Sequence, residues 1–155
     1  MDRSLIDEPV CSSDIASVEV DPCMVTKLLK KLDPSKSAGP DYLPAIFLIN
    51  FAETIAVPLS LLFKKSLTEG LVPAIWKHAF VTPVHKKGSK ADISHYRPIS
   101  KLCQVSKVLE DIVHSQVYPS IKQSLSQSQH GFMRGRSTVS NLVLLNSFVT
   151  KAMEE

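Results

Sequence analysis

The chain has 155 residues, of which 44% are hydrophobic and 21% are charged, and its formal net charge is only +3. This composition is typical of a globular domain with a core, excludes an intrinsically disordered chain, and points to no class of partner. Three cysteines without a C-x-x-C pair argue against a disulfide framework. We therefore expect an intracellular protein, in the cytoplasm, the nucleus or both.

Residues 1–17 show no hydrophobic periodicity and are rich in carboxylates, so we expect a flexible acidic leader that is not a signal peptide. Structure should begin with a helix in "VDPCMVTKLLKKL". Asp21 suits its N-cap and Pro22 its first position, and Val20 and Val25 are spaced for a hydrophobic staple. The apolar spacing predicts one buried face on this helix: Val25, Leu28, Leu29 and Leu32.

The next segment, "DPSKSAGPD", has the prolines, glycine, serines and aspartates of a loop. It is no Walker motif. Two interpretations of Lys36 stay open, because it could contact a nucleic-acid backbone or be an ordinary loop lysine.

Residues 42–65 are long and apolar enough to suggest a membrane span. However, a carboxylate at Glu53 and two prolines inside the stretch would be costly in lipid. Two buried helices, at about 44–51 and 54–68, explain the pattern better, with a break near Glu53 and a stop at Gly70. The second would bury four side chains: Leu59, Leu62, Phe63 and Leu67. We expect no membrane association.

The stretch "VTPVHKKGSKADISHYRPIS" predicts a β-hairpin, with strands at 80–85 and 93–99 around a long basic loop. The loop carries Lys86, Lys87, Gly88 and Lys90. Lysines offer mobile point charges to phosphate, and Arg97, held extended by the following proline, offers a rigid fork. The residues alone leave two interpretations open: contact with phosphate or nucleic acid, or a solvated turn. His78, His85 and His95 are interpreted as hydrogen-bonded surface groups.

After the hairpin, an amphipathic helix is predicted from Leu102, Val105, Val108, Leu109, Ile112 and Val113. The spacing of Val117, Ile121 and Leu125 predicts a shorter helix, which Pro119 should break. "SQHGFMRGRST" then forms a second basic turn. Ser137 or Thr138 can cap a last helix that carries Val139, Leu142, Val143 and Phe148.

The cations are clustered along the chain. Residues 77–107 hold seven lysines and arginines against Asp92 alone, and residues 120–138 hold three with no acid. Such clustering is typical of a protein that binds a polyanion, although a solubilising surface would give the same pattern. The carboxylates are scattered, whereas metal-assisted phosphoryl transfer needs several at one point. We predict no metal site and no catalytic residue.

Four segments together carry a resemblance to a known family. "LDPSKSAGPDYLP", "PLSLLFKKSLTEGLVPAIWKHAFVTPVHKKG", "HYRPISKLCQVSKVLEDIV" and "QHGFMRGRST" occur in this order and spacing in reverse transcriptases of non-LTR retrotransposons, the jockey-like group especially. The resemblance covers about residues 18–150.

The resemblance implies an α+β, helix-dominated fragment of the right-hand polymerase fold, with residues 18–155 forming fingers and the start of the palm. Arg97 would contact the nucleoside triphosphate, assisted by Lys86 and Lys87. The resemblance also implies contacts with nucleic acid from a larger set: Lys36, Lys90, Gln129, Gly131, Arg134, Gly135 and Arg136. Its partners would be an RNA template, a DNA primer, deoxynucleoside triphosphates and the missing palm and thumb.

The family's metal-binding aspartates follow the "GRST" turn, and this sequence ends at Glu155, before them. The resemblance therefore implies a truncated RNA-directed DNA polymerase that is inactive by itself. Mg²⁺ is expected for the full-length enzyme and no cofactor for this fragment. The alternative is a non-catalytic nucleic-acid-binding module, or an inert relic, derived from such an element.

Overall fold

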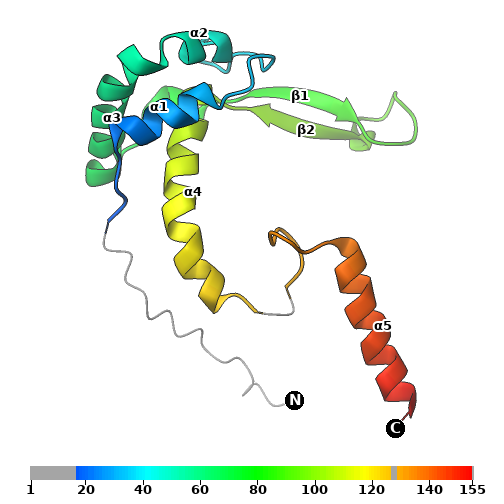
Figure 1. The fold of residues 1–155 in the computed structure, drawn as a ribbon. Coiled ribbons are helices and arrows are strands. Elements are labelled where there is room, and N and C mark those ends of the chain that lie inside the picture. Colours follow the sequence, from blue (N-terminus) through cyan, green and yellow to red (C-terminus); the bar gives the residue numbers. More distant parts are fainter. Residues whose placement is uncertain (1–16, 127–128, 155) are drawn as a thin grey trace. The chain divides into compact units, whose positions relative to one another are not determined.

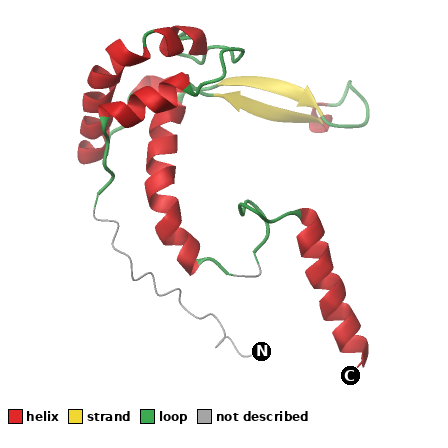
Figure 2. Cartoon of the chain, viewed as in Figure 1, coloured by secondary structure: helices red, strands yellow, loops and turns green. Residues whose placement is uncertain are grey.

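The computed structural model describes residues 17–126 and 129–154, and the expected leader lies, up to residue 16, outside them. The chain divides into two compact units, one ending at Tyr118 and the other beginning at Pro119. Helices dominate the described residues, which hold one two-stranded antiparallel sheet (Figure 2). The expected helix-dominated composition with one hairpin is confirmed.

The first helix, α1 (Pro22–Lys30), begins where the sequence predicts. The Asp21 carboxylate accepts hydrogen bonds from the backbone N–H groups of Cys23 and Met24, at 3.0 and 3.3 Å. These bonds satisfy donors that have no partner inside the helix. Val20 and Val25 are both buried, as a hydrophobic staple requires.

Two further helices, α2 (Ala45–Asn50) and α3 (Ala52–Glu69), replace the suspected membrane span. The chain breaks at Phe51, two residues before the predicted point, and α3 ends at Gly70 with φ of 65°. The predicted burial of Leu62 is wrong, because the buried stripe of α3 passes through Ala56 and Phe63 and leaves Leu62 40% exposed. None of the helices within the described residues could cross a membrane.

The core of the first unit lies between α1, α3 and the first half of α4 (Gln104–Ser124). Trp76, in the short 3-10 helix η1 (Ala74–Lys77), packs edge-on against Phe63 with ring centroids 5.7 Å apart. Gln116 of α4 also holds the start of the unit: its side-chain oxygen accepts from the Glu19 N–H at 2.8 Å, and its side-chain nitrogen donates to the Glu19 carbonyl at 2.6 Å. The buried cluster consists of Val20, Val25, Leu29, Leu48, Ala52, Ala56, Phe63, Trp76, Cys103, Val105, Val108, Leu109 and Ile112.

The predicted hairpin is present as β1 (Phe80–His85) and β2 (Tyr96–Lys101), paired from Phe80–Lys101 to His85–Tyr96. Figure 1 shows this ribbon extending away from the helices of its unit. The second strand begins at Tyr96, so the predicted start at residue 93 is wrong. The Asp92 side chain accepts from the Ser94 N–H at 2.8 Å and starts a 3-10 turn, η2 (Ile93–His95), in place of strand.

The predicted break at Pro119 is also wrong, because α4 continues through it to Ser124. A proline removes one helical hydrogen bond, and the turns on either side can carry the helix through that position. Pro119 does mark the division between the two units.

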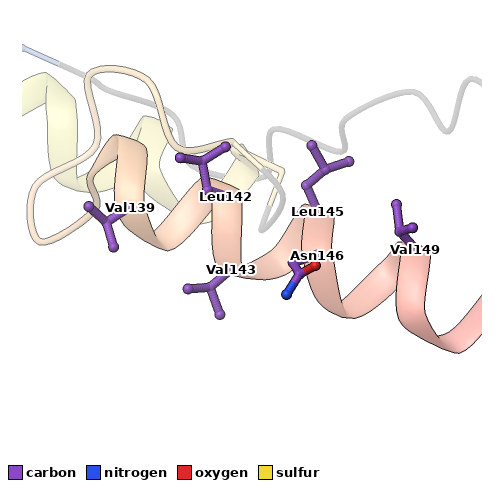
Figure 3. A pocket seen from close by; sticks show the side chains of 6 residues that line it. All are labelled: Val139, Leu142, Val143, Leu145, Asn146 and Val149. Carbon is purple, nitrogen blue, oxygen red and sulfur yellow. The ribbon is translucent and has the colours of Figure 1, made fainter.

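In the second unit, α5 (Thr138–Glu154) begins after Ser137, as predicted. The Ser137 hydroxyl accepts from the Ser140 N–H at 3.2 Å, and the Ser140 hydroxyl accepts from the Ser137 N–H at 2.9 Å, which is a reciprocal cap. Figure 3 shows apolar side chains projecting from successive turns of α5. The apolar side chains are exposed. With Asn146 they line a hollow on the surface of α5, whose lining residues are Val139, Leu142, Val143, Leu145, Asn146 and Val149.

Candidate nucleic-acid interface

The tip of the hairpin is an ordered loop. The Lys86 N–H donates to the His95 carbonyl at 2.8 Å and extends the strand ladder by one step. Three ring side chains then hold loop carbonyls. The His85 Nε2 lies 3.1 Å from the Gly88 carbonyl, the His95 Nδ1 lies 3.0 Å from the carbonyl of Ser89, and the Tyr96 hydroxyl donates to that of Lys90 at 2.9 Å. The loop backbone is therefore fixed by its own strands.

Gly88 is required for this closure. Its φ of +81° lies in the left-handed region, and a Cβ there would come within 2.5 Å of the His95 ring. The turn closes over the His95 ring. The flanking cations Lys86, Lys87 and Lys90 are exposed to solvent.

Asp92, the single acid of this stretch, is engaged within the loop. The hydroxyl and the backbone N–H of Ser94 donate to its carboxylate and hold the pKa of Asp92 below its ordinary value of 3.8. The Asp92 Oδ2 also lies 4.0 Å from the His95 Nε2. Lys86, Lys87 and Lys90 form no ion pair with any described residue, so their charges face solvent.

Arg97 lies on a defined face of the ribbon. It pairs with Val84, and Lys101 pairs with Phe80. Paired residues of an antiparallel ribbon project to the same side, as do residues two apart, so Arg97 and Lys101 share one face. Lys86 follows Val84 in this alternation and continues the same face. The hairpin thus places Arg97, Lys86 and Lys101 on one face. Lys87 and Lys90 lie in the exposed loop at its tip.

Lys36 lies elsewhere, in the loop after α1. Its ammonium group is 3.7 Å from the Asp33 carboxylate. The hydroxyl and the N–H of Ser35 donate to the same carboxylate and, with Lys36, lower the pKa of Asp33. Such an exposed pair is weak, so Lys36 stays accessible to another anion.

The second basic turn, residues 129–136, belongs to the unit that begins at Pro119. The Arg136 guanidinium donates to the Gln129 carbonyl at 2.7 Å and closes the turn. Gly135 has φ of +80°, whereas Gly131 adopts no left-handed conformation. Arg134 is exposed. The structure thus gives Arg136 a role in shaping the turn and leaves Arg134 facing solvent.

The described residues contain no group of three or more His, Cys, Asp and Glu side chains placed to hold a metal ion. Carboxylate oxygens are the ligands that Mg²⁺ prefers. Within the described residues, no cluster of three or more such side chains supplies these ligands at one point.

Sequence reasoning identified the cations of the hairpin but missed two aromatic residues. Tyr96 fixes the loop through its hydroxyl, and its ring packs against His85 with centroids 5.3 Å apart. Tyr42 contacts Phe80 at the base of the hairpin. Tyr96 could have been recognised in the sequence because ring residues flank the basic loop, with His85 before it and Tyr96 after it.

The sequence is similar to that of RNA-directed DNA polymerases of transposable elements. It is 27% identical over 134 residues to the probable RNA-directed DNA polymerase from transposon BS of Drosophila melanogaster, and equally so to the RNA-directed DNA polymerase from mobile element jockey of Drosophila funebris. It is 26% identical over 132 residues to the probable RNA-directed DNA polymerase from transposon X-element of Drosophila melanogaster.

These matches cover 83–84% of this chain, but the chain spans only 14–15% of the length of the curated relatives. No family model matches the sequence. The three matches to transposon polymerases confirm the resemblance to jockey-like reverse transcriptases.

Proposed function

We propose that this chain is part of an RNA-directed DNA polymerase of a non-LTR retrotransposon and contributes contacts to the template and the incoming nucleotide. The ribbon of β1 and β2 would be the fingers hairpin of a right-hand polymerase fold. The observation that carries the proposal is the ordered hairpin tip, whose cations face solvent while its one acid is engaged by Ser94. The similarity along most of the chain supports the same assignment.

In this proposal Arg97 binds triphosphate oxygens, because its planar fork can form two parallel hydrogen bonds with them. Lys86 and Lys87 assist as mobile point charges. The remaining candidates would contact the nucleic-acid backbone: Lys36, Lys90, Gln129, Gly131, Arg134, Gly135 and Arg136. The substrates would be an RNA template, a DNA primer and deoxynucleoside triphosphates, with Mg²⁺ bound by carboxylates outside the described residues.

A binding experiment tests this proposal. Fluorescence anisotropy with a labelled primed RNA template should show affinity that falls steeply as salt rises, because phosphate contacts release counterions. The triple variant Lys86→Gln, Lys87→Gln, Arg97→Gln should reduce the slope of log affinity against log salt by about 2 to 3.

A matched control removes the same charge from positions outside the hairpin. Lys27→Gln, Lys31→Gln and Lys64→Gln together change the net charge equally at exposed positions. This control should keep most of the salt slope. Equal slopes for the two triple variants would show that the hairpin has no special role, and binding that ignores salt would refute the proposal. We expect no primer extension by these 155 residues alone.

A further inference from the structure

Tyr42 holds an unusual conformation in the loop between α1 and α2. Its φ is +55°, in the left-handed region that non-glycine residues seldom occupy, and its side chain is 76% exposed. An exposed tyrosine gains little from burial that could offset such strain. Strained residues of this kind often mark places where a side chain is presented to a ligand.

The loop that carries Tyr42 is tightly held. Gly39 packs so closely on the start of α4 that a Cβ there would lie 2.6 Å from the Cys103 backbone. The Gln104 side chain donates to the Ser37 carbonyl at 3.2 Å, and the Tyr42 N–H donates to the Gly39 carbonyl at 3.0 Å. The ring is therefore presented by a loop whose preceding residues are fixed against the start of α4.

The Tyr42 ring also has a fixed neighbour. It meets the Phe80 ring edge-to-face, with centroids 5.9 Å apart and an interplanar angle of 64°. Phe80 is the first residue of β1, is itself partly exposed, and pairs with Lys101. Phe80 projects from the face of the ribbon that also carries Arg97, about 13 Å further along the strands. One face thus presents the aromatic pair with Lys101 beside Phe80, and Arg97 further along the strands.

We infer that Tyr42 is a stacking platform for one base of a single-stranded nucleic acid, with a flanking phosphate of that strand at Lys101 and with Arg97, further along the same face, left for the triphosphate. The inference rests on the proposed function and adds a base contact to its phosphate contacts. Base–aromatic stacking beside a row of cations is how proteins hold single strands without reading sequence. Asp41, the acid next to Tyr42, is engaged within the loop: one carboxylate oxygen accepts from the Leu43 N–H at 3.2 Å and the other is buried.

Glycine substitution provides a sharp test, because it removes the ring and also relieves the backbone strain. Tyr42→Gly should fold with an unfolding temperature no lower than that of the original chain. Binding to a labelled oligothymidylate of about 15 nucleotides should nevertheless weaken roughly 5- to 100-fold. Tyr42→Phe keeps the ring and should bind as the original chain does.

A second probe separates base contacts from phosphate contacts. An oligomer of the same length built from abasic nucleotides has the same phosphates and no bases, so the original chain and Tyr42→Gly should bind it equally. Equal binding of oligothymidylate by these two proteins would overturn the inference, because the Tyr42 ring would then make no contact with a base. The salt-dependent binding of the proposed function would still stand. If Tyr42→Phe loses as much affinity as Tyr42→Gly, the stacking role is wrong. No salt-dependent binding by the original chain would overturn both.

Discussion

At Gly39 two backbones come so close that only a hydrogen atom fits between them. The residue is buried, and an added methyl group would meet the Cα and N of Cys103 and the carbonyl oxygen of Leu102, all at 2.6 Å. Cys103 is itself held: its thiol donates to the Ile75 carbonyl at 3.6 Å, and burial raises its pKa. The requirement for glycine here is steric and does not come from its backbone freedom.

Gly39→Ala should therefore destabilise the first unit by about 1–3 kcal/mol, the usual cost of inserting a methyl group into a packed site. Urea unfolding followed by circular dichroism measures this change in the free energy of unfolding. The matched control is Gly131→Ala, since a Cβ at Gly131 meets no atom within 4 Å. If the control costs as much as the Gly39 substitution, close packing does not explain the role of Gly39.

At the scale of elements, α1 is held to α3 by its apolar face rather than by charge. The Lys30 ammonium lies 2.6 Å from the Glu53 carboxylate, and this hydrogen bond lowers the pKa of Glu53. Both side chains are well exposed, so the pair adds little stability. Val25 and Leu29, in contrast, are fully buried.

Leu29→Ala should lower the free energy of unfolding by about 2–5 kcal/mol, because it leaves a cavity between α1 and its neighbours. Leu61→Ala makes the same chemical change at an exposed position of α3 and should cost far less. Denaturant unfolding of the two variants side by side measures the difference. Similar losses would mean that α1 is not packed as described.

At the scale of the whole molecule, apolar surface is unevenly distributed. The buried cluster lies in the unit that ends at Tyr118, whereas α5 in the other unit carries exposed apolar residues along its length. Exposed apolar patches of this kind promote association.

Replacing Leu142 and Leu145 by glutamate should reduce self-association of the purified chain, because charge on an exposed apolar face opposes its burial. Sedimentation velocity over a range of protein concentrations measures this. Asn141→Glu with Ser147→Glu adds the same charge at exposed polar positions of the same helix. A reduction by both pairs alike would show that net charge, and not the apolar face, controls association.

The sequence predicted best those features that depend on a few neighbouring residues. The cap at Asp21, the stop at Gly70 and the cap at Ser137 are each defined by side chains within four positions, and all three are confirmed. Leu62 and Pro119 were wrong because burial and helix continuity depend on what packs against a segment, which local sequence does not specify.

The candidate site divides in the same way. Its cations are visible as a cluster of lysines in the sequence, and alternation along β2 gives the face of Arg97 once the register is known. The bonds from His85, His95 and Tyr96 to loop carbonyls depend on how the loop closes in three dimensions. The contact of Tyr42 with Phe80 joins positions 38 residues apart, and no periodicity signals it.

The chain contains a single tryptophan, and that residue is the buried Trp76 against Phe63. Intrinsic emission excited selectively in the indole band therefore comes from the core of one unit alone. Its wavelength and quenching report whether that core is intact, because Trp76 is buried there. The protein thus carries a built-in optical label that separates loss of folding from loss of binding.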